Sequence, residues 1–200
     1  MKIAIAGQMA SGKTTLANNL QQELEDLDYR VARHSLGFKV KQIGTDLFGM
    51  TDKDRPLLQK IGMKMREIRE EVWIEYVNRS IEEDLAADKY DVAIVDDVRF
   101  VNEAKFFHNQ DWFTIRLNIG EELQQERLQK TYDNWEVHWD NRKDPSETEV
   151  AQIPSESLSM DMIADDSDNT LTQVLSYLET FGCFQDPAII KNPIGKLDNL

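Results

Sequence analysis

The sequence predicts an α/β fold in which a parallel sheet of about five strands is covered by helices on both faces. Short apolar runs alternate along the chain with longer segments of helical period. A turn that contains two glycines separates the first apolar run from the first helical segment. The chain has 200 residues, enough for one well-filled core, so a single domain over residues 1–200 is expected.

Each predicted strand is a short run that is rich in apolar residues and is bounded by polar or turn-forming residues. The runs lie at residues 3–6, 30–35, 92–95, 113–118 and 160–164. Because a helical segment lies between consecutive runs, the strands are expected to pair in parallel.

Apolar residues at helical spacing predict the helices between these strands. In the first helix, Leu16, Leu20, Leu24 and Leu27 form one apolar stripe. The predicted helices span residues 13–27, 40–48, 55–84, 102–108, 121–130 and 170–181. Residues 185–200 contain Pro187, Pro193 and Gly195 and are expected to form an irregular tail.

Residues 132–158 interrupt this alternation, because they are rich in Asp, Asn, Trp, Pro, Ser and Glu without a clear period. The segment is too long for a plain connection. We therefore expect a mobile lid or insertion over residues 127–158, which includes the end of the preceding helix. Residues 36–84 are expected to form a helical region of the same domain.

The charge balance excludes several classes of protein. The chain has 37 Asp and Glu residues against 23 Lys and Arg, a net charge of −14, which argues against a broad nucleic-acid-binding surface. One cysteine, Cys183, cannot form an internal disulfide, and the three histidines lack metal-ligand spacing. No apolar run approaches the ~18 residues of a membrane span, and the N-terminus lacks the pattern of a signal peptide. We expect a cytoplasmic protein, a monomer or a homodimer, that acts on small molecules.

The segment Gly7-Gln8-Met9-Ala10-Ser11-Gly12-Lys13-Thr14 fits the pattern G-x-x-x-x-G-K-[ST] and lies between the first predicted strand and helix. Its glycines let successive N–H groups point into one concavity, where the helix N-terminus favours an anion. Lys13 adds charge at the β- and γ-phosphates, and the Thr14 hydroxyl is a ligand for Mg²⁺. The motif predicts a site for ATP or GTP with Mg²⁺ that contains Gly7, Ala10, Ser11, Gly12, Lys13, Thr14 and Thr15.

This loop does not identify the reaction, because switches, ATPases, transporters and kinases share it. The sequence has neither an NKxD-type guanine-reading motif nor an internal repeat. A small-molecule kinase therefore fits better than a GTPase switch or a mechanical ATPase.

Two aspartates, Asp96 and Asp97, follow the apolar run at residues 92–95. They are expected at the carboxyl edge of the sheet, where ligands bind in open α/β folds. At least one of them is predicted to hold Mg²⁺ through its waters or to contact the phosphoryl acceptor, and Arg99 is predicted to clamp a phosphate. The alternatives are a helix cap for an aspartate and a surface pair between Arg99 and Glu103.

The run at residues 55–84 has three faces when it is phased as one helix at roughly 100° per residue. The expected core face holds Leu58, Ile61, Met65, Ile68, Val72 and Tyr76. A second face holds Arg55, Gln59, Gly62, Arg66, Arg69 and Trp73. An anionic, planar ligand accounts for the second face, because arginines bind a phosphate and Trp73 offers a wall or a stack. The alternative is an ordinary surface with pairs such as Arg66–Glu70.

Five segments carry a family resemblance. They are Gly7–Thr14, Phe38-Lys39-Val40-Lys41 before Leu47-Phe48-Gly49, Arg55-Pro56-Leu57-Leu58-Gln59-Lys60-Ile61-Gly62 continuing to Arg66 and Trp73, Asp97-Val98-Arg99-Phe100 with Asn102-Glu103, and Pro145-Ser146-Glu147-Thr148. Together they resemble the phage-type deoxynucleoside monophosphate kinases, a branch of the P-loop nucleoside monophosphate kinases. The resemblance implies transfer of the γ-phosphoryl group of ATP, with Mg²⁺, to a deoxynucleoside 5′-monophosphate. It also implies that residues 36–84 bind the acceptor.

The resemblance further implies roles for individual residues. The catalytic residues are expected to be Lys13, Asp97, Arg99 and Arg127, with Mg²⁺ held by Thr14 and, partly through water, by Asp97. The acceptor is expected to contact Lys39, Arg55, Gln59, Arg66, Arg69, Trp73, Arg99 and Glu103. The lid is expected to supply Arg127, Lys130 and Arg142. If a phage encodes the protein, we expect it to be located in the cytoplasm of the host cell.

Two other functions remain open at this stage. One is a kinase of another small metabolite, with the dephospho-coenzyme A kinases as the nearest relatives, because they also have an Asp-led motif at this strand end. The other is a regulatory module that binds ATP without turning over an acceptor. In that case the acidic segment at residues 144–186, which has no Lys or Arg, is a candidate dock for a basic partner.

Overall fold

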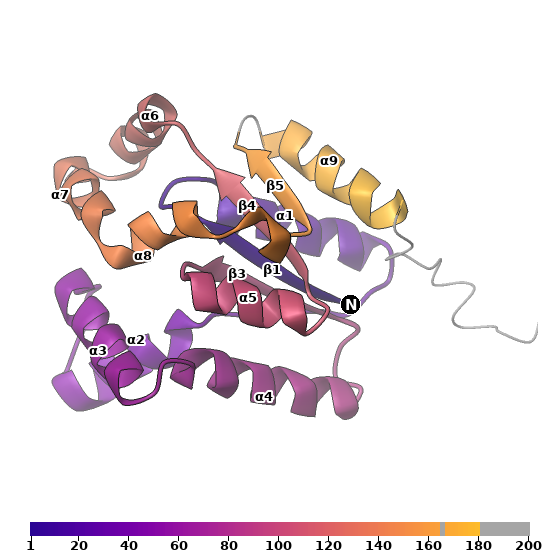
Figure 1. Ribbon diagram of the computed structural model, residues 1–200, viewed down its shortest axis with the longest axis horizontal. Helices are drawn as coiled ribbons and strands as arrows, with labels where there is room; N and C mark the ends of the chain where they lie inside the picture. The colour runs from indigo at the N-terminus through magenta and orange to yellow at the C-terminus, as the bar shows by residue number, and fades with distance from the viewer. Residues whose placement is uncertain (165–166, 181–200) are drawn as a thin grey trace, which may run out of the picture.

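The computed structural model describes residues 1–164 and 167–180 (Figure 1). Within this part of the chain, one sheet of parallel strands has the order β2-β3-β1-β4-β5. The strands are β1 (Lys2–Gly7), β2 (Val31–His34), β3 (Val92–Val98), β4 (Phe113–Asn118) and β5 (Met160–Ile163). The predicted fold class is confirmed. The largest difference is at β3, which extends three residues beyond the prediction and includes Asp96 and Asp97.

Helices connect the strands and cover the sheet. They are α1 (Lys13–Asp26), α2 (Gly37–Phe48), α3 (Arg55–Ile68), α4 (Val72–Ala86), α5 (Val101–Asn109), α6 (Glu121–Thr131), α7 (Trp135–Asp140), α8 (Pro145–Thr148) and α9 (Ser167–Thr180). Short 3₁₀ turns lie at Asn141–Lys143, Glu149–Gln152 and Ser155–Ser157. No helix among residues 1–164 and 167–180 combines the length and the apolar character that crossing a bilayer requires.

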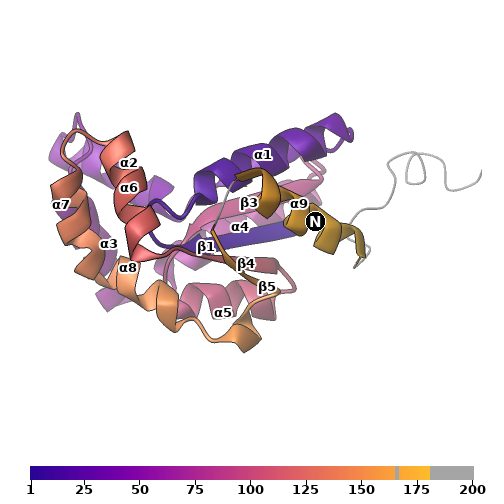
Figure 2. The same cartoon turned by 90° about the horizontal axis from the view of Figure 1, so that it is seen from above.

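Side chains of the central strand alternate between two hydrophobic cores. Ile3 and Ile5 of β1 belong to the core that α1 and α9 cover, whereas Ala4 and Ala6 belong to the core on the opposite face, under α4 and α5 (Figure 2). All four side chains are fully buried. A strand that is apolar on both faces needs a sheet that is covered on both sides, which is the arrangement that the sequence predicts.

The predicted helix at residues 55–84 is two helices, so the single-helix phasing is wrong beyond Ile68. Arg69 has an extended backbone, with φ −152° and ψ 114°, and Ile68 of the expected core face is 80% exposed. The break lets the buried Trp73 fold back on α3, where its indole N–H donates to the Gly62 carbonyl at 3.2 Å. Burial of Trp73 and Ile74 favours this break over a straight, exposed helix.

The segment at residues 132–158 is more regular than expected. It forms α7 and α8, of six and four residues, and the three 3₁₀ turns. Helices this short span fewer than two turns, so they leave no repeated apolar period in the sequence. The predicted tail at 185–200, Cys183 and the last residue of the predicted helix at 170–181 lie outside the described residues.

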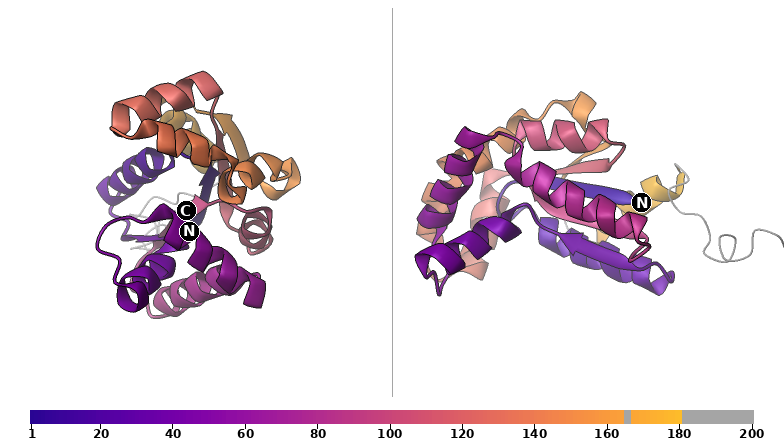
Figure 3. Two further views of the ribbon diagram at one scale, coloured as in Figure 1. Left: turned by 90° about the vertical axis from the view of Figure 1, so that its left-hand side faces the viewer. Right: turned by 90° about the horizontal axis from the view of Figure 1, so that it is seen from below.

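Two groups of helices stand at the carboxyl edge of the sheet. Helices α2 and α3 lie on one side, and α6, α7 and α8 on the other (Figures 1 and 3). The turn between β1 and α1 lies at the same edge, because β1 ends at Gly7 and α1 begins at Lys13. Ligands of open α/β sheets bind at this edge.

Candidate active site

A pocket of about 960 Å³ lies at the carboxyl edge of the sheet. Its lining comes from the loop after β1, the ends of β2 and β3, helices α2 and α3, and helices α6 and α8. Its lining cations are Lys13, Lys41, Lys53, Arg55, Arg66, Arg99, Arg127 and Lys130, against the acids Asp96, Asp97, Glu103, Asp144 and Glu147. The pocket is therefore locally cationic in a chain of net charge −14, which suits an anionic ligand.

The phosphate loop has the geometry that its glycines predict. A Cβ on Gly7 would lie 2.5 Å from Ser11 Oγ and 2.8 Å from the Leu117 carbonyl oxygen, so only glycine fits at this position. Gly12, before the first turn of α1, has φ 96°, in the left-handed region. Among the described residues, the buried Ser11 Oγ has no hydrogen-bond partner, which is the condition expected of a hydroxyl that meets a ligand.

The carbonyl groups of this loop are held by side chains. Lys13 Nζ donates to the Gln8 carbonyl at 2.6 Å, and Gln124 Nε2 of α6 donates to the Met9 carbonyl at 2.9 Å. A guanidinium nitrogen of Arg127, also on α6, donates to the Ala10 carbonyl at 3.2 Å. Helix α6 therefore fixes the tip of the loop.

Lys13 lies buried at the base of the pocket. Burial, and then the neighbouring Arg99 guanidinium, lower the pKa of Lys13 to about 7, against the opposing effect of Glu147, Asp97 and Asp96. Two cations that repel each other in one pocket are stabilised by an anion bound between them. The residues around Lys13 thus fit a phosphate group.

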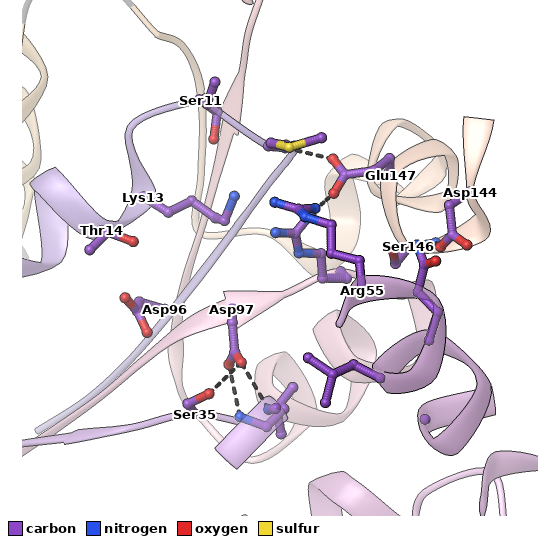
Figure 4. A pocket seen from close by; sticks show the side chains of 18 of the residues that line it. Ser11, Lys13, Thr14, Ser35, Arg55, Asp96, Asp97, Asp144, Ser146 and Glu147 are labelled. Atoms are coloured by element: carbon purple, nitrogen blue, oxygen red, sulfur yellow. Dashed lines mark hydrogen bonds and ion pairs between the residues drawn. The ribbon is translucent and has the colours of Figure 1, made fainter. Parts of the chain in front are cut away.

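The two aspartates at the end of β3 have different environments. Asp97 accepts hydrogen bonds from Ser35 Oγ at 2.6 Å, from Leu36 N at 2.8 Å and from Gly37 N at 2.9 Å, so it caps the start of α2. Asp96 forms an ion pair with Arg33 and lies on the side of the pocket that faces Thr14 (Figure 4). Burial raises the pKa of the Asp96 carboxyl, and Arg33 opposes this effect.

The side-chain oxygen atoms near Thr14 are suited to coordinate Mg²⁺. The Thr14 hydroxyl and the Asp96 carboxylate both line the pocket, and Mg²⁺ prefers oxygen ligands with several waters. In the described part of the chain, no group of three or more His, Cys, Asp or Glu side chains is arranged to hold a metal ion. A magnesium ion here would take its remaining ligands from phosphates and water, as in phosphoryl-transfer sites generally.

Glu103, a predicted acceptor residue, is a buried carboxylate that organises the end of β3. It forms an ion pair with Arg66 of α3 and accepts hydrogen bonds from Arg99 N at 2.7 Å and Phe100 N at 3.0 Å. The Arg66 guanidinium also lies over the Phe100 ring, 4.0 Å from its centroid. Burial raises the pKa of Glu103, and the Arg66 charge and the two N–H groups oppose the rise.

Glu147 of α8 belongs to one of the five segments that carry the family resemblance, but the sequence analysis assigned it no role in the site. Its carboxylate is buried, accepts a hydrogen bond from Met9 N at 2.6 Å and forms an ion pair with Arg99. The local signal is the start of α8, because Asp144 caps this helix and Pro145 occupies its first turn. These features predict a short helix, but nothing local predicts where its glutamate reaches.

A second wall of the pocket is formed by α3 and the start of α4. Arg55, Gln59, Gly62, Arg66 and Trp73 line it, as the second face of the predicted helix implies. Within the described chain, the buried Arg55 Nε has no hydrogen-bond partner, and no neighbouring atom lies within 4 Å of a Cβ built on Gly62. Burial, and then the charge of Arg55, lower the pKa of Lys53 beside it. This wall therefore offers positive charge and free space together.

Apart from Gly7 of the phosphate loop, three predicted site residues do not reach the pocket lining. Arg69 follows the break after α3, is largely exposed and pairs with Glu75 at 2.7 Å. Lys39 Nζ donates to Gln42 Oε1 at 2.7 Å, and the Arg142 guanidinium lies over the Trp139 ring, 3.9 Å from its centroid. Among the unpredicted residues, Lys41 and Lys53 supply charge to the lining, and Tyr132 supplies an aromatic ring.

The remaining predicted site residues lie together. The phosphate loop from Ala10 to Thr15, Asp97, Arg99, Glu103, Arg127 and Lys130 all belong to the lining of the same pocket. Gly7 is the exception in the loop, because it lies behind Ser11 rather than on the pocket surface.

Comparisons with known proteins identify the fold. No protein-family model matches the sequence, and no curated protein matches it. A crystal structure of an uncharacterized protein from Eubacterium ventriosum is similar, with 11% identity, a TM-score of 0.56, and coverage of 90% of this chain and 98% of that chain. The structure of shikimate kinase from Bacteroides thetaiotaomicron is also similar, with 14% identity, a TM-score of 0.50, and coverage of 90% of this chain and 98% of that chain. Deoxyadenosine kinase from M. mycoides, at 15% identity, has a TM-score of 0.46 over 90% of this chain and 100% of that chain. At these identities the first two likenesses show the fold alone: the chain shares its α/β fold with the Eubacterium protein and with the Bacteroides shikimate kinase.

Proposed function

We propose that the protein is a deoxynucleoside monophosphate kinase, which transfers the γ-phosphoryl group of ATP to a deoxynucleoside 5′-monophosphate. One observation carries the proposal: a single pocket joins two separate sets of phosphate-binding groups. The loop with Lys13 lines this pocket, and so do Arg55 and Arg66 of α3 and Arg99 after β3, which we assign to the acceptor side. Two anionic substrates need such a pair of sites, whereas a nucleotide switch needs only the first.

The donor site is built on the phosphate loop. The N-terminus of α1, the Ser11 hydroxyl and Lys13 are suited to bind the phosphates of ATP, because they combine N–H donors with positive charge. We assign Mg²⁺ to the Thr14 hydroxyl and, through water, to the Asp96 carboxylate. Bound there, Mg²⁺ supplies neutralisation of the charge on the β- and γ-phosphates.

The acceptor site is assigned to α3 and the end of β3. Arg55 and Arg99 are suited to the acceptor phosphate, and Arg66 supports them from α3. The indole N–H of Trp73 is already bonded to Gly62, so its ring acts as an apolar wall for a planar base. Gln59 offers hydrogen bonds to the same base.

The chemistry that we propose requires no covalent intermediate. An oxygen of the acceptor phosphate attacks the γ-phosphorus of ATP in line, and ADP leaves. The side chains hold two polyanions together, stabilise their charge and exclude water. Arg127 and Lys130 of α6 are placed to add charge on the lid side of the pocket.

The test is a coupled ADP-release assay with ATP, Mg²⁺ and each deoxynucleoside monophosphate in turn. Dephospho-coenzyme A and shikimate serve as the comparison acceptors. The proposal expects acceptor-dependent ADP release with at least one monophosphate and none with the comparison acceptors. Release with dephospho-coenzyme A alone would assign the alternative metabolite kinase. ATP binding without turnover of any acceptor would favour the regulatory module.

A further inference from the structure

Glu147 connects two parts of the site that are far apart in the sequence. Its carboxylate contacts Met9, 138 residues earlier, and Arg99, 48 residues earlier. The side chain is only 4% exposed. A buried carboxylate costs free energy unless its partners satisfy it, so these two contacts are the reason that Glu147 is stable in this position.

Arg99 is held at both ends by carboxylates. Its backbone N–H donates to Glu103 at 2.7 Å, and its guanidinium pairs with Glu147. The Arg99 side chain nevertheless keeps 25% of its surface exposed and lines the pocket. The two contacts therefore fix the direction of the guanidinium and leave part of it open to a ligand.

The phosphate loop is held by the same glutamate. Met9 has its N–H bonded to Glu147 and its carbonyl bonded to Gln124 of α6, at 2.6 Å and 2.9 Å. Gln8 Nε2 also donates to the backbone carbonyl of Glu147 at 3.3 Å. Helices α6 and α8 thus clamp the tip of the loop from the lid side.

The charge of Glu147 matters as well as its shape. Lys13 and Arg99 are like charges that line one pocket, and Glu147 lines the same pocket and forms an ion pair with Arg99. A carboxylate in this position reduces the repulsion that the two cations exert on each other. A neutral amide would keep the hydrogen-bond acceptor for Met9 and lose this effect.

We infer that Glu147 is a positioning residue, which fixes Arg99 of the acceptor site relative to the phosphate loop of the donor site. The inference rests on the proposed function. In-line transfer depends on the distance and the angle between two bound phosphates, and a misplacement of about 1 Å has a large effect on the rate. Glu147 acts on the reaction through Arg99 and Met9.

The test compares Glu147→Gln with Glu156→Gln, an exposed glutamate of the same segment, as the matched control. Melting temperature, the ATP dissociation constant, kcat and the acceptor KM are measured for each. Glu147→Gln is expected to stay folded, to lower kcat by ~10-fold or more and to raise the acceptor KM. The ATP dissociation constant should rise by only ~3-fold, because the single amide oxygen still accepts the Met9 N–H but no longer links the loop to Arg99. The control should match the wild type.

A double-mutant cycle separates positioning from a general structural role. If Glu147 acts through Arg99, Glu147→Gln in an Arg99→Ala background should lower kcat by no more than ~2-fold. A full ~10-fold loss in both backgrounds overturns the inference. If Glu147→Gln does not fold, Glu147→Asp takes its place, because it keeps the charge and shortens the reach. Wild-type kinetics in folded Glu147→Asp would then overturn the inference.

Failure of the proposed function can be distinguished from failure of the inference about Glu147. If the wild type turns over none of the monophosphates, the proposed function fails. The ATP dissociation constant then decides the inference, since it needs no acceptor. An increase of ~3-fold in Glu147→Gln, absent from the control, supports the contact with the loop, and unchanged affinity overturns it.

Discussion

The carboxylate of Asp97 accepts a hydrogen bond from the Ser35 hydroxyl at 2.6 Å, where β2 leads into α2. Backbone N–H groups of Leu36 and Gly37 complete the same set of contacts. Asp96, one residue earlier on β3, is turned toward Thr14 instead (Figure 4). Successive side chains of a strand point in opposite directions, so adjacent identical residues acquire different roles.

The first prediction separates these two aspartates. Asp96→Ala should lower the rate of phosphoryl transfer by ~10²-fold and weaken its dependence on Mg²⁺, because a metal-holding carboxylate is lost. Asp97→Ala should lower the free energy of unfolding by ~2 kcal/mol, because the start of α2 loses its acceptor. Urea unfolding and Mg²⁺ titrations of the rate measure the two effects. If instead Asp97→Ala weakens the dependence on Mg²⁺ and Asp96→Ala lowers the free energy of unfolding, Asp97 is the metal-holding residue.

Lys13→Ala should abolish phosphoryl transfer with little loss of folding. A loss of ~10²-fold or more is expected, because the lysine stabilises charge at the β- and γ-phosphates. Lys64→Ala is the matched control, since Lys64 is exposed and pairs only with Glu67 at 2.7 Å within the described chain. Turnover is measured at saturating ATP, after circular dichroism has verified folding. Near-normal turnover in folded Lys13→Ala would contradict the assignment of the phosphate loop.

Arg55→Ala should impair use of the monophosphate far more than binding of ATP. The expected loss is ~2 to 4 kcal/mol of transition-state stabilisation, because a charge-assisted contact to the acceptor phosphate disappears. Arg69→Ala is the control on the same stretch of chain, because Arg69 lies outside the pocket lining and pairs with Glu75.

Arg66→Ala and Arg99→Ala should likewise impair use of the monophosphate more than binding of ATP. Their partners Glu103 and Glu147 are buried, so folding is measured first. ATP affinity and acceptor kinetics are then determined separately. If these variants weaken ATP binding and leave the acceptor parameters unchanged, α3 is not the acceptor helix.

Gly62→Ala should change stability and activity in opposite directions. Alanine is favoured over glycine inside a helix by ~1 kcal/mol, so the melting temperature should rise. The added methyl group projects into open space that lines the acceptor side of the pocket, so kcat/KM for the monophosphate should fall by ~10-fold. Gly120→Ala adds a methyl group to open space outside the lining and should leave kcat/KM unchanged. Equal activity in Gly62→Ala would place the acceptor elsewhere.

The lid prediction concerns residues 127–145, which include the end of α6 and all of α7. This segment should become more protected from hydrogen exchange when both phosphate sites are filled, because closing basic side chains over the phosphates expels water. Hydrogen exchange is compared with and without a bisubstrate analogue that joins adenosine to a deoxynucleoside through a phosphate chain. Protection should rise more over residues 127–145 than over residues 170–180 of α9. Equal exchange in the two states would make the segment a passive insertion.

The sequence by itself determined the features that depend on neighbouring or periodic residues. The apolar runs of the strands, the stripe of Leu16, Leu20 and Leu24 on α1 and the phosphate loop at Gly7–Thr14 are of this kind. Each is specified within a few turns or one strand, because backbone geometry repeats every 3.6 or 2 residues. The face with Arg55, Gln59, Gly62 and Arg66 was also predictable, since it lies within the unbroken helix α3.

Only the tertiary structure decided which of these groups meet. The helix breaks at Arg69 because Trp73 gains burial against α3, and no proline or glycine marks that point in the sequence. Asp97 became a cap and Asp96 the carboxylate facing Thr14 because β2 runs beside β3. Glu147 meets Met9 and Arg99 because α8 crosses the edge of the sheet. Such contacts join residues tens of positions apart, so their free energy depends on burial and charge that no local pattern contains.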